Sequence, residues 1–234
     1  GWSWELRGNE GACRGTQIVT GMRIAKRGCG VRRLAPARIA PNHLCMDRFN
    51  SLVGRLLVAM PGIDDPRFEH AVILVCAHDS EHALGLRLDQ PAPGVDLSAV
   101  LEKLKAETSP AASGKKVLVG GPVERERGFV LHTDDWISEE SSHAFGDGLA
   151  MTGTREALIA MVDPVAGPRR SSLMLGYAGW GEGQLEDELS ENVWLTADAD
   201  LDLIFDGDHA SKWSRALKGL GVDAAMLSGQ SGRA

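Results

Sequence analysis

A cysteine and two histidines lie close together in the chain, at Cys76, His78 and His82. If a strand runs through Cys76 and His78, the thiol and the imidazole share one face, where they could hold a soft metal ion or form a catalytic thiolate. Against this, Cys76 belongs to the apolar run Val-Ile-Leu-Val-Cys-Ala, which is typical of an inert buried cysteine, and no second ligand pair follows at zinc-finger spacing. We therefore expect no metal here, and a reactive Cys76 stays an open alternative.

Two further positions carry groups that could act as acids, bases or cation ligands. His132 precedes Asp134 and Asp135, but the chain has no GxSxG motif that this histidine could serve. The pattern favours a histidine at the end of a strand, followed by a solvated acidic loop. The Asp64-Asp65 pair could contribute to a site for a hard cation, but it lies in a turn rich in proline and glycine, where aspartate is common.

The glycine-rich run from Leu175 to Glu186 is the most distinctive part of the sequence. Its glycines, with the bulky Tyr177 and Trp180 between them, predict a strand that turns sharply into a helix. Backbone amides at a helix N-terminus can bind phosphate, but residues 182–191 carry five acidic and no basic side chains. Neither a GK[ST] element nor an ordered GxGxxG motif is present, so a phosphate-binding loop is disfavoured.

The elements that must position these residues follow from apolar periodicity. Leu97, Val100, Leu101 and Leu104 form one helical stripe, which Asp96 is placed to cap. Residues 133–147 read as the longest irregular segment. Strands and helices alternate irregularly, which predicts a mixed α+β fold rather than a doubly wound parallel sheet. We expect strands over residues 55–60, 71–76, 83–88, 117–119, 129–132, 148–152, 172–177 and 193–196, and further helices after residue 152, over 184–192 and over 213–220.

Composition fits a globular chain of 234 residues, with 43% hydrophobic and 24% charged residues. No apolar run approaches the roughly 20 residues that span a bilayer, so no membrane segment is expected. The four cysteines form no CxxC pair, which favours a reducing cytoplasm. Aromatic residues make up only 5% of the chain and no helix-turn-helix pattern is present, so direct nucleic-acid binding is disfavoured.

Charge divides the chain in two. Residues 1–45 carry eight Lys/Arg and two Asp/Glu, a net charge of +6, whereas residues 46–234 carry seventeen and thirty, a net charge of −13. The basic segment has no helical or strand period. We expect residues 1–45 to be a disordered extension, upstream of the natural start at Met46, and residues 46–234 to form a single domain. A nucleic-acid-binding arm or a targeting peptide is the alternative for the extension.

Several motifs in a fixed order resemble the AlgH/YqgE family of bacterial proteins. They are Leu57-Val-Ala-Met-Pro61, Asp65-Pro-Arg-Phe68, Cys76-Ala-His78, Gly120-Gly-Pro-Val123, Arg127-Gly-Phe-Val-Leu-His132, Gly176-Tyr-Ala-Gly-Trp180, Gly183-Gln-Leu-Glu186 and Trp194-Leu195. The resemblance implies a mixed fold in which a bent sheet closes into a partial barrel flanked by helices. It also implies a cytosolic protein linked to transcriptional regulation, without established cofactor or catalytic residues.

Two functions follow from these observations. The interpretation we favour is a non-enzymatic cytoplasmic protein that acts in gene regulation through protein partners and needs no cofactor. The alternative is a small-molecule-binding or enzymatic protein whose site lies where the Cys76–His78 strand end and the two glycine-rich turns converge. The candidate ligand-binding residues are Asp65, Cys76, His78, Gly120, Gly121, His132, Tyr177 and Trp180.

Overall fold

The computed structural model describes residues 51–63, 65–106 and 112–223, all of which belong to one compact unit. Their ten strands form one sheet in the order β10-β1-β2-β3-β9-β6-β8-β7, and the β4–β5 pair joins it through a parallel pairing of β5 with β9. All other pairings are antiparallel. The strands are β1 (Arg55–Ala59), β2 (Val72–His78), β3 (Ala83–Arg87), β4 (Pro91–Asp96), β5 (Lys116–Val119), β6 (Val123–Thr133), β7 (Ser142–Phe145), β8 (Leu149–Thr152), β9 (Ser171–Trp180) and β10 (Trp194–Asp198).

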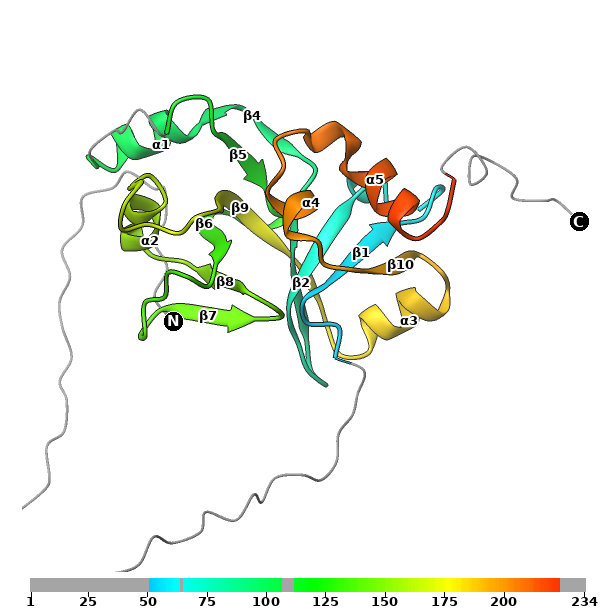
Figure 1. The fold of residues 1–234 in the computed structure, drawn as a ribbon. Coiled ribbons are helices and arrows are strands. Elements are labelled where there is room, and N and C mark those ends of the chain that lie inside the picture. Colours follow the sequence, from blue (N-terminus) through cyan, green and yellow to red (C-terminus); the bar gives the residue numbers. More distant parts are fainter. Residues whose placement is uncertain (1–50, 64, 107–111, 224–234) are drawn as a thin grey trace, which may run out of the picture. The chain divides into compact units, whose positions relative to one another are not determined.

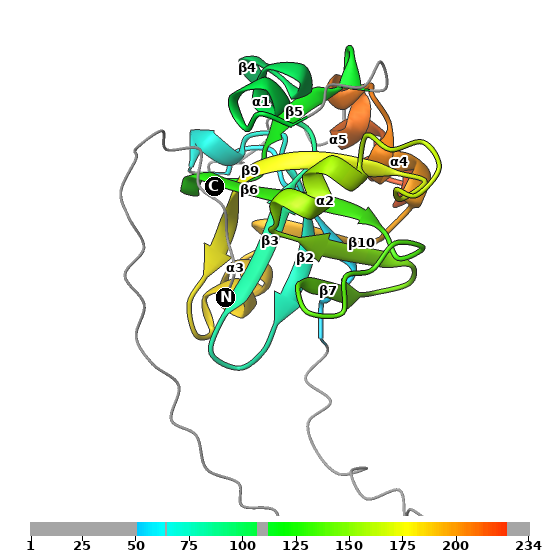
Figure 2. The same ribbon diagram turned by 90° about the vertical axis from the view of Figure 1, so that its left-hand side faces the viewer.

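The sheet curls, and five α-helices flank it within the described ranges (Figures 1 and 2). They are α1 (Leu97–Lys103), α2 (Arg155–Ala160), α3 (Gln184–Ser190), α4 (Leu201–Phe205) and α5 (Lys212–Gly219). The expected α+β class, with a bent sheet forming a partial barrel, is confirmed. None of these helices is both long and apolar enough to cross a bilayer. The predicted extension over residues 1–45 lies outside the described residues.

Strands β1 and β2 are apolar on both faces because both faces are covered. Side chains alternate along a strand, so neighbouring residues enter different cores. Leu56 and Leu74 pack in a core that also holds residues of α4 and α5, whereas Leu57 and Ile73 pack in a core that includes Leu185 of α3. A third core joins α1 and α2 to strands β5, β6 and β9. The three cores hold the helices on the sheet.

Two glycine motifs meet where the loop before β6 crosses β9. An added Cβ at Gly121 would lie 2.0 Å from the carbonyl carbon of Tyr177, and one at Gly120 would lie 2.2 Å from the carbonyl oxygen of Gly176. Gly176 itself has φ +71°, and a Cβ there would lie 2.6 Å from the carbonyl oxygen of Val123. We name Gly120, Gly121 and Gly176 the glycine crossing. Only residues without a side chain allow this approach of two backbones.

The structure corrects several local predictions. Strand β9 continues to Trp180, so Gly176 and Gly179 lie inside a strand and not in the turn to α3. Strand β7 lies within the segment that was predicted to be irregular, and only Phe145 of its four residues is buried. Strand β4 and helix α4 were not predicted. Asp96 occupies the cap position of α1 without a capping hydrogen bond, and its carboxylate instead lies 3.5 Å from Lys116 Nζ.

Candidate functional site

A cleft of about 580 Å³ opens between the loop that follows β1, the start of β6, the end of β9, helix α3 and the start of β10. We name it the aromatic cleft because three aromatic rings line it. The rings of Trp180 and Trp194 lie edge to face with centroids 6.2 Å apart, and Phe68 and Trp194 do so at 5.8 Å. The lining residues are Ile63, Asp65, Arg67, Phe68, Pro122, Val123, Gly179, Trp180, Gln184, Glu188, Val193 and Trp194.

One carboxylate fixes the two indoles. Trp180 Nε1 donates a hydrogen bond of 2.8 Å to Glu188 Oε2, and Trp194 Nε1 donates one of 2.7 Å to the same oxygen. The other oxygen of Glu188 accepts a 2.8 Å bond from Gln184 Nε2, one helical turn earlier. Helix α3 lies between Trp180 and Trp194 in the sequence, so folding it back onto the sheet brings both rings to its own glutamate. The floor of the cleft is therefore held rigidly.

A second wall is a short turn of 3-10 helix, Pro66–Phe68, whose Phe68 packs against Trp194. Asp65 caps it by accepting a 2.9 Å bond from the Arg67 backbone N–H, and Arg67 Nη2 lies 2.6 Å from Asp65 Oδ2. Hydrogen bonds from Arg67 lower the pKa of the Asp65 carboxyl, so this group is ionised at neutral pH. The guanidinium carbon of Arg67 lies 6.0 Å from the centroid of the Phe68 ring.

A buried ion pair anchors this wall to the sheet. Arg87 and Asp89 are 9% and 10% exposed, and Arg87 Nη2 lies 2.6 Å from Asp89 Oδ2. Arg87 Nη1 also donates to the carbonyl oxygen of Arg67, in the wall, and Nη2 to that of Glu69, the residue that follows the wall. Asp89 also accepts a 2.9 Å bond from the Val72 backbone N–H. The pair thus satisfies backbone groups of a loop that carries no long element of its own.

The third wall, Pro122–Val123, is placed by the glycine crossing. Gly120 donates a 2.8 Å bond to the Leu175 carbonyl and accepts one of 2.8 Å from the Arg87 backbone N–H. Val123 then pairs with Tyr177 of β9. Gly120, Gly121 and Tyr177, which were predicted as ligand-binding candidates, therefore support the cleft and do not line it in the structure.

Cys76 lies in the interior, away from the cleft. Its side chain is 0% exposed and packs in the core beside α4 and α5. Burial raises the pKa of the Cys76 thiol far above its ordinary value, because a thiolate would be poorly solvated there. This environment is that of an inert thiol.

His78 lies two residues after Cys76 in β2, but its imidazole contacts Leu52 and Glu186 and not the core that holds Cys76. Its Nδ1 accepts a 3.1 Å bond from the Leu52 backbone N–H, so the ring proton lies on Nε2, which donates a 2.6 Å bond to Glu186 of α3. The imidazole joins the end of β2 to helix α3. It does not line the aromatic cleft.

His132 is fully buried and both of its ring nitrogens have partners. Nδ1 donates a 2.9 Å bond to the Thr133 carbonyl, so Nε2 accepts a 2.9 Å bond from Thr152 Oγ1. Ser142 Oγ continues this chain of hydroxyl groups at 2.7 Å from Thr152 Oγ1. Burial lowers the pKa of His132, which keeps the ring neutral. The arrangement orients β6 against β8 and leaves no nitrogen free to act as a base.

The candidates named from the sequence thus separate into three groups. Asp65 and Trp180 line one cleft, the glycines and Tyr177 support it, and Cys76, His78 and His132 lie elsewhere. Sequence reasoning missed Trp194, Glu188 and the Arg87–Asp89 pair. The i, i+4 spacing of Gln184 and Glu188 on a helix flanked by two tryptophans was the signal that could have identified the first two.

A second, more polar cavity of about 720 Å³ lies between β6, β9 and α4. The charged groups around it are largely used by one another, since Arg170 lies 2.5 Å from Asp202 and Arg169 lies 2.9 Å from Asp135. No aromatic ring lines this cavity. We therefore place the candidate site in the aromatic cleft.

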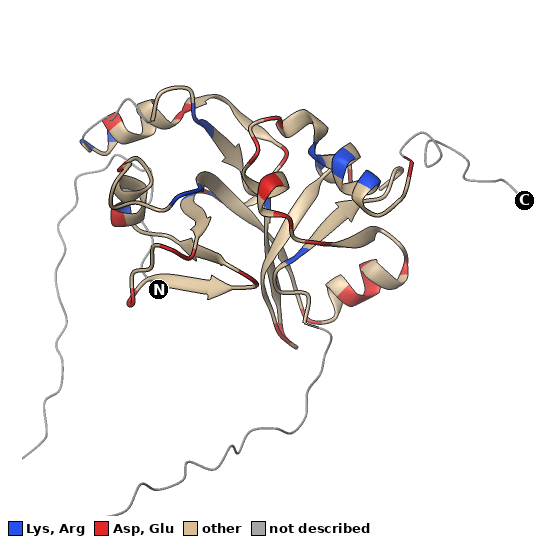
Figure 3. Cartoon of the chain, in the orientation of Figure 1, with Lys and Arg blue, Asp and Glu red and all other residues tan. Residues whose placement is uncertain are grey.

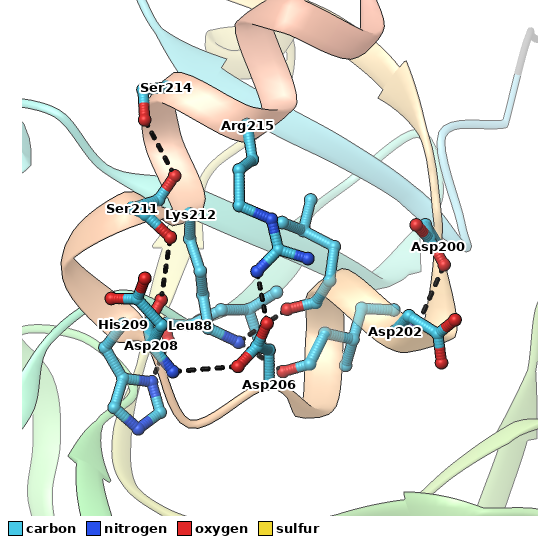
Figure 4. Close-up of polar contacts among 12 residues, drawn as sticks. Leu88, Asp200, Asp202, Asp206, Asp208, His209, Ser211, Lys212, Ser214 and Arg215 are labelled. Carbon is cyan, nitrogen blue, oxygen red and sulfur yellow. Dashed lines mark hydrogen bonds and ion pairs between the residues drawn. The ribbon is translucent and has the colours of Figure 1, made fainter.

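A buried lysine next to α4 also has a structural explanation (Figure 4). Lys212 Nζ donates 2.6 Å bonds to the carbonyl oxygens of Leu203 and Ile204, at the C-terminal end of α4. Burial lowers the pKa of Lys212 to about 8, and Asp206 opposes this shift. An ammonium group is a favourable partner for the last carbonyls of a helix. The side chain of Lys212 therefore caps the C-terminal end of α4, and its amine is not accessible.

Negative charge surrounds the aromatic cleft on the side of α3. Helix α3 and its flanks carry Glu182, Glu186, Asp187, Glu188 and Glu191 and no lysine or arginine, and in Figure 3 this helix has red (Asp, Glu) but no blue (Lys, Arg) positions. Across the described ranges, no three histidine, cysteine or acidic side chains gather in a way that could hold a metal ion. The site is an acidic, aromatic recess.

The fold and the cleft define a class of α+β protein in which a curled sheet, fixed by a glycine crossing, carries an aromatic recess. Residues 56–225 match the family model described as AlgH-like, and the chain belongs to this family. UPF0301 proteins from Caulobacter vibrioides and Ruegeria pomeroyi are 55% and 48% identical to it over 183 and 187 residues. Each match spans 78% of this chain, and 94% and 99% of those proteins.

Solved structures agree with this assignment. The solution structure of the AlgH protein from Pseudomonas aeruginosa is 38% identical, with a TM-score of 0.65, and the match covers 82% of this chain and all of that one (100%). A crystal structure of a protein from Corynebacterium diphtheriae is 21% identical, with a TM-score of 0.58, over 71% of this chain and 85% of that one. The second likeness concerns the fold alone. The resemblance to the AlgH/YqgE family is confirmed.

Proposed function

We propose that this protein is a non-enzymatic cytoplasmic regulator that acts through protein partners and binds them at the aromatic cleft. The main support is a cleft of about 580 Å³ lined by two tryptophans, 6% and 3% exposed, that one glutamate holds in place. Tryptophan is enriched among the residues that dominate binding energy at protein interfaces. Rings already fixed by hydrogen bonds lose little freedom when a partner binds, which favours affinity.

The enzymatic alternative has less support. The thiol of Cys76 is buried, and neither Cys76 nor His78, on which this alternative depends, lines the cleft. Direct binding of nucleic acid is disfavoured because the acidic side chains of α3 repel phosphate. A small-molecule ligand remains the second candidate, since about 580 Å³ falls within the range of known ligand pockets.

A complementation experiment tests the proposal. In a strain that lacks the gene, we expect changed transcript levels that the wild-type protein restores. Val123→Arg, which places a long charged side chain at the cleft wall, should fail to restore them. Val165→Arg is the matched control, because Val165 is 92% exposed and does not line the cleft, and it should restore them fully.

Cross-linking distinguishes the two candidates. A photoreactive amino acid at position 123 should give a covalent adduct with a protein, and the same group at position 165 should not. A small ligand that co-purifies with the protein, without any protein adduct, would favour the second candidate. Unchanged transcripts in the deletion strain, or full restoration by Val123→Arg, would contradict the proposal.

A further inference from the structure

We infer that the aromatic cleft recognises a cationic side chain, a lysine or arginine presented by a segment of the partner protein. This inference rests on the proposed function, because it names the chemistry of the partner that the cleft binds. It uses three features of the cleft, namely its uncompensated carboxylate, its rings, and a guanidinium that the chain itself already holds at the rim.

Glu188 supplies the negative charge. Its two oxygens accept hydrogen bonds from indole and amide N–H groups, all of which are neutral donors. These bonds hold the carboxylate in place without cancelling its charge. Asp65, the other carboxylate of the lining, is already neutralised by Arg67. The cleft therefore has a net negative charge, and the acidic side chains of α3 strengthen the field around it.

Aromatic rings supply the second feature. Trp180, Trp194 and Phe68 line the same space as Glu188, and Phe68 is the most exposed of the three rings, since Trp180 and Trp194 are 6% and 3% exposed. The quadrupole of an aromatic ring attracts a cation placed over its face, and tryptophan gives the strongest effect. The aliphatic stem of a lysine or arginine can at the same time cover apolar lining such as Ile63 and Val193. Aromatic faces beside a carboxylate thus suit both parts of a long basic side chain.

The rim already shows this kind of contact within the chain. Arg67 pairs with Asp65 through two nitrogens, Nε at 3.0 Å and Nη2 at 2.6 Å, and its guanidinium lies 6.0 Å from the Phe68 centroid. Carboxylate and ring together hold this guanidinium at the mouth. Deeper in, Glu188 with Trp180 and Trp194 repeats the combination of carboxylate and rings without a cation from the described residues.

Two small molecules of nearly equal shape test the inference. Butylguanidinium carries a positive charge, and butylurea is its neutral analogue. In the full-length protein with ¹⁵N-labelled tryptophan, butylguanidinium should shift the indole N–H signals of both Trp180 and Trp194 saturably. Its affinity should exceed that of butylurea about tenfold, and the preference should weaken as salt is added.

Variants assign the effect to one carboxylate. Glu188→Gln keeps the shape of the side chain but removes its charge, and should reduce the preference for the cation to about twofold or less. Asp187→Asn removes the same charge from an exposed neighbour on α3 that does not line the cleft, and should keep most of the preference. The comparison in the wild-type protein remains decisive even if Glu188→Gln does not fold.

The outcomes separate this inference from the proposed function. Equal binding of the two probes, or no shift of either indole signal at tens of millimolar, overturns the assignment of a cationic ligand. A partner adduct at position 123 would then show that docking stands without it. Conversely, cation binding in a protein whose Val123→Arg variant restores transcription fully would uphold the inference about the cleft and refute its regulatory use.

Discussion

Hydrogen-bonded polar and aromatic side chains lie at both ends of β9, but their surroundings differ. At the start of the strand, Ser171 pairs with His132, whose ring nitrogens are both used by neighbours and whose side chain is fully buried. At its end, Trp180 lines a cleft and donates a hydrogen bond to the side chain of Glu188. Polar and aromatic residues alone therefore do not mark a functional site. What distinguishes the second end is the cleft that its largely buried tryptophan lines, together with a carboxylate that no opposite charge among the described residues compensates.

The glycine crossing in the middle of β9 offers the largest change. Gly176→Ala places a Cβ 2.6 Å from the Val123 carbonyl oxygen at a φ of +71°, and should lower the free energy of unfolding by about 3 kcal/mol. Both ends of the strand should lose their order together. Urea denaturation followed by far-ultraviolet circular dichroism measures the loss.

Gly181→Ala is the matched control from the same glycine-rich run. No atom lies within 4 Å of the position that its Cβ would occupy. Its free energy of unfolding should stay within about 0.5 kcal/mol of the wild type. Equal effects of the two substitutions would refute the role we give to the crossing.

Removing the imidazole probes the closed end of β9. His132→Gln should cost about 2 kcal/mol at about pH 8, because partners in the interior lose their hydrogen bonds. Burial lowers the pKa of His132 below the usual 6.5, so on acidification the unfolded chain binds a proton before the folded one. Stability that depends on His132 is therefore lost as the pH falls through this range.

The gap in stability between the wild type and His132→Gln should accordingly narrow between about pH 8 and about pH 5.5. His209 also has a pKa lowered by burial, but it is present in both proteins and cancels in the difference. Thermal or urea denaturation at several pH values gives this gap. A gap that stays constant or widens on acidification would contradict a neutral, buried His132.

The open end should tolerate substitution best. Glu188→Gln replaces the charged oxygen that accepts both indole N–H groups by a neutral amide oxygen, and removes the oxygen that accepts from Gln184 Nε2. It should reduce the free energy of unfolding by about 1 kcal/mol. Asp187→Asn, on the exposed face of α3, should change it by no more than about 0.5 kcal/mol. A loss at Glu188 as large as that at Gly176 would mean that the cleft carboxylate is chiefly a structural group.

The fold was predictable where local pattern and burial agree. The apolar runs of β1 and β2 and the helical stripes of α1 and α5 gave these elements within a few residues. Strand β7 was not predicted, because three of its four side chains lie largely outside the core and the sequence therefore shows no apolar alternation. Helix α4 has five residues, too few to show a period.

The site was predictable only in part, because its residues meet through tertiary folding. Trp180 and Asp65 belong to distinctive motifs and were named from them. Glu188 and Trp194 acquire their role only when α3 folds back against β10, and the i, i+4 spacing of Gln184 and Glu188 between two tryptophans is the one local sign of that contact. Arg87 and Asp89 read as a polar strand end, yet their burial ties the wall of the cleft to the sheet.

The pairing of β1 with β10 has a consequence for how the chain reaches this state. It joins Arg55 to Asp198, so β1, near the start of the described chain, can complete its pairing only after β10 has been synthesised. Pairings between residues so distant in sequence form slowly, since a long loop must close before they contribute any stability. During synthesis on the ribosome, β1 is therefore an apolar edge without its neighbour until β10 emerges, and a chain truncated before residue 194 should be prone to aggregation.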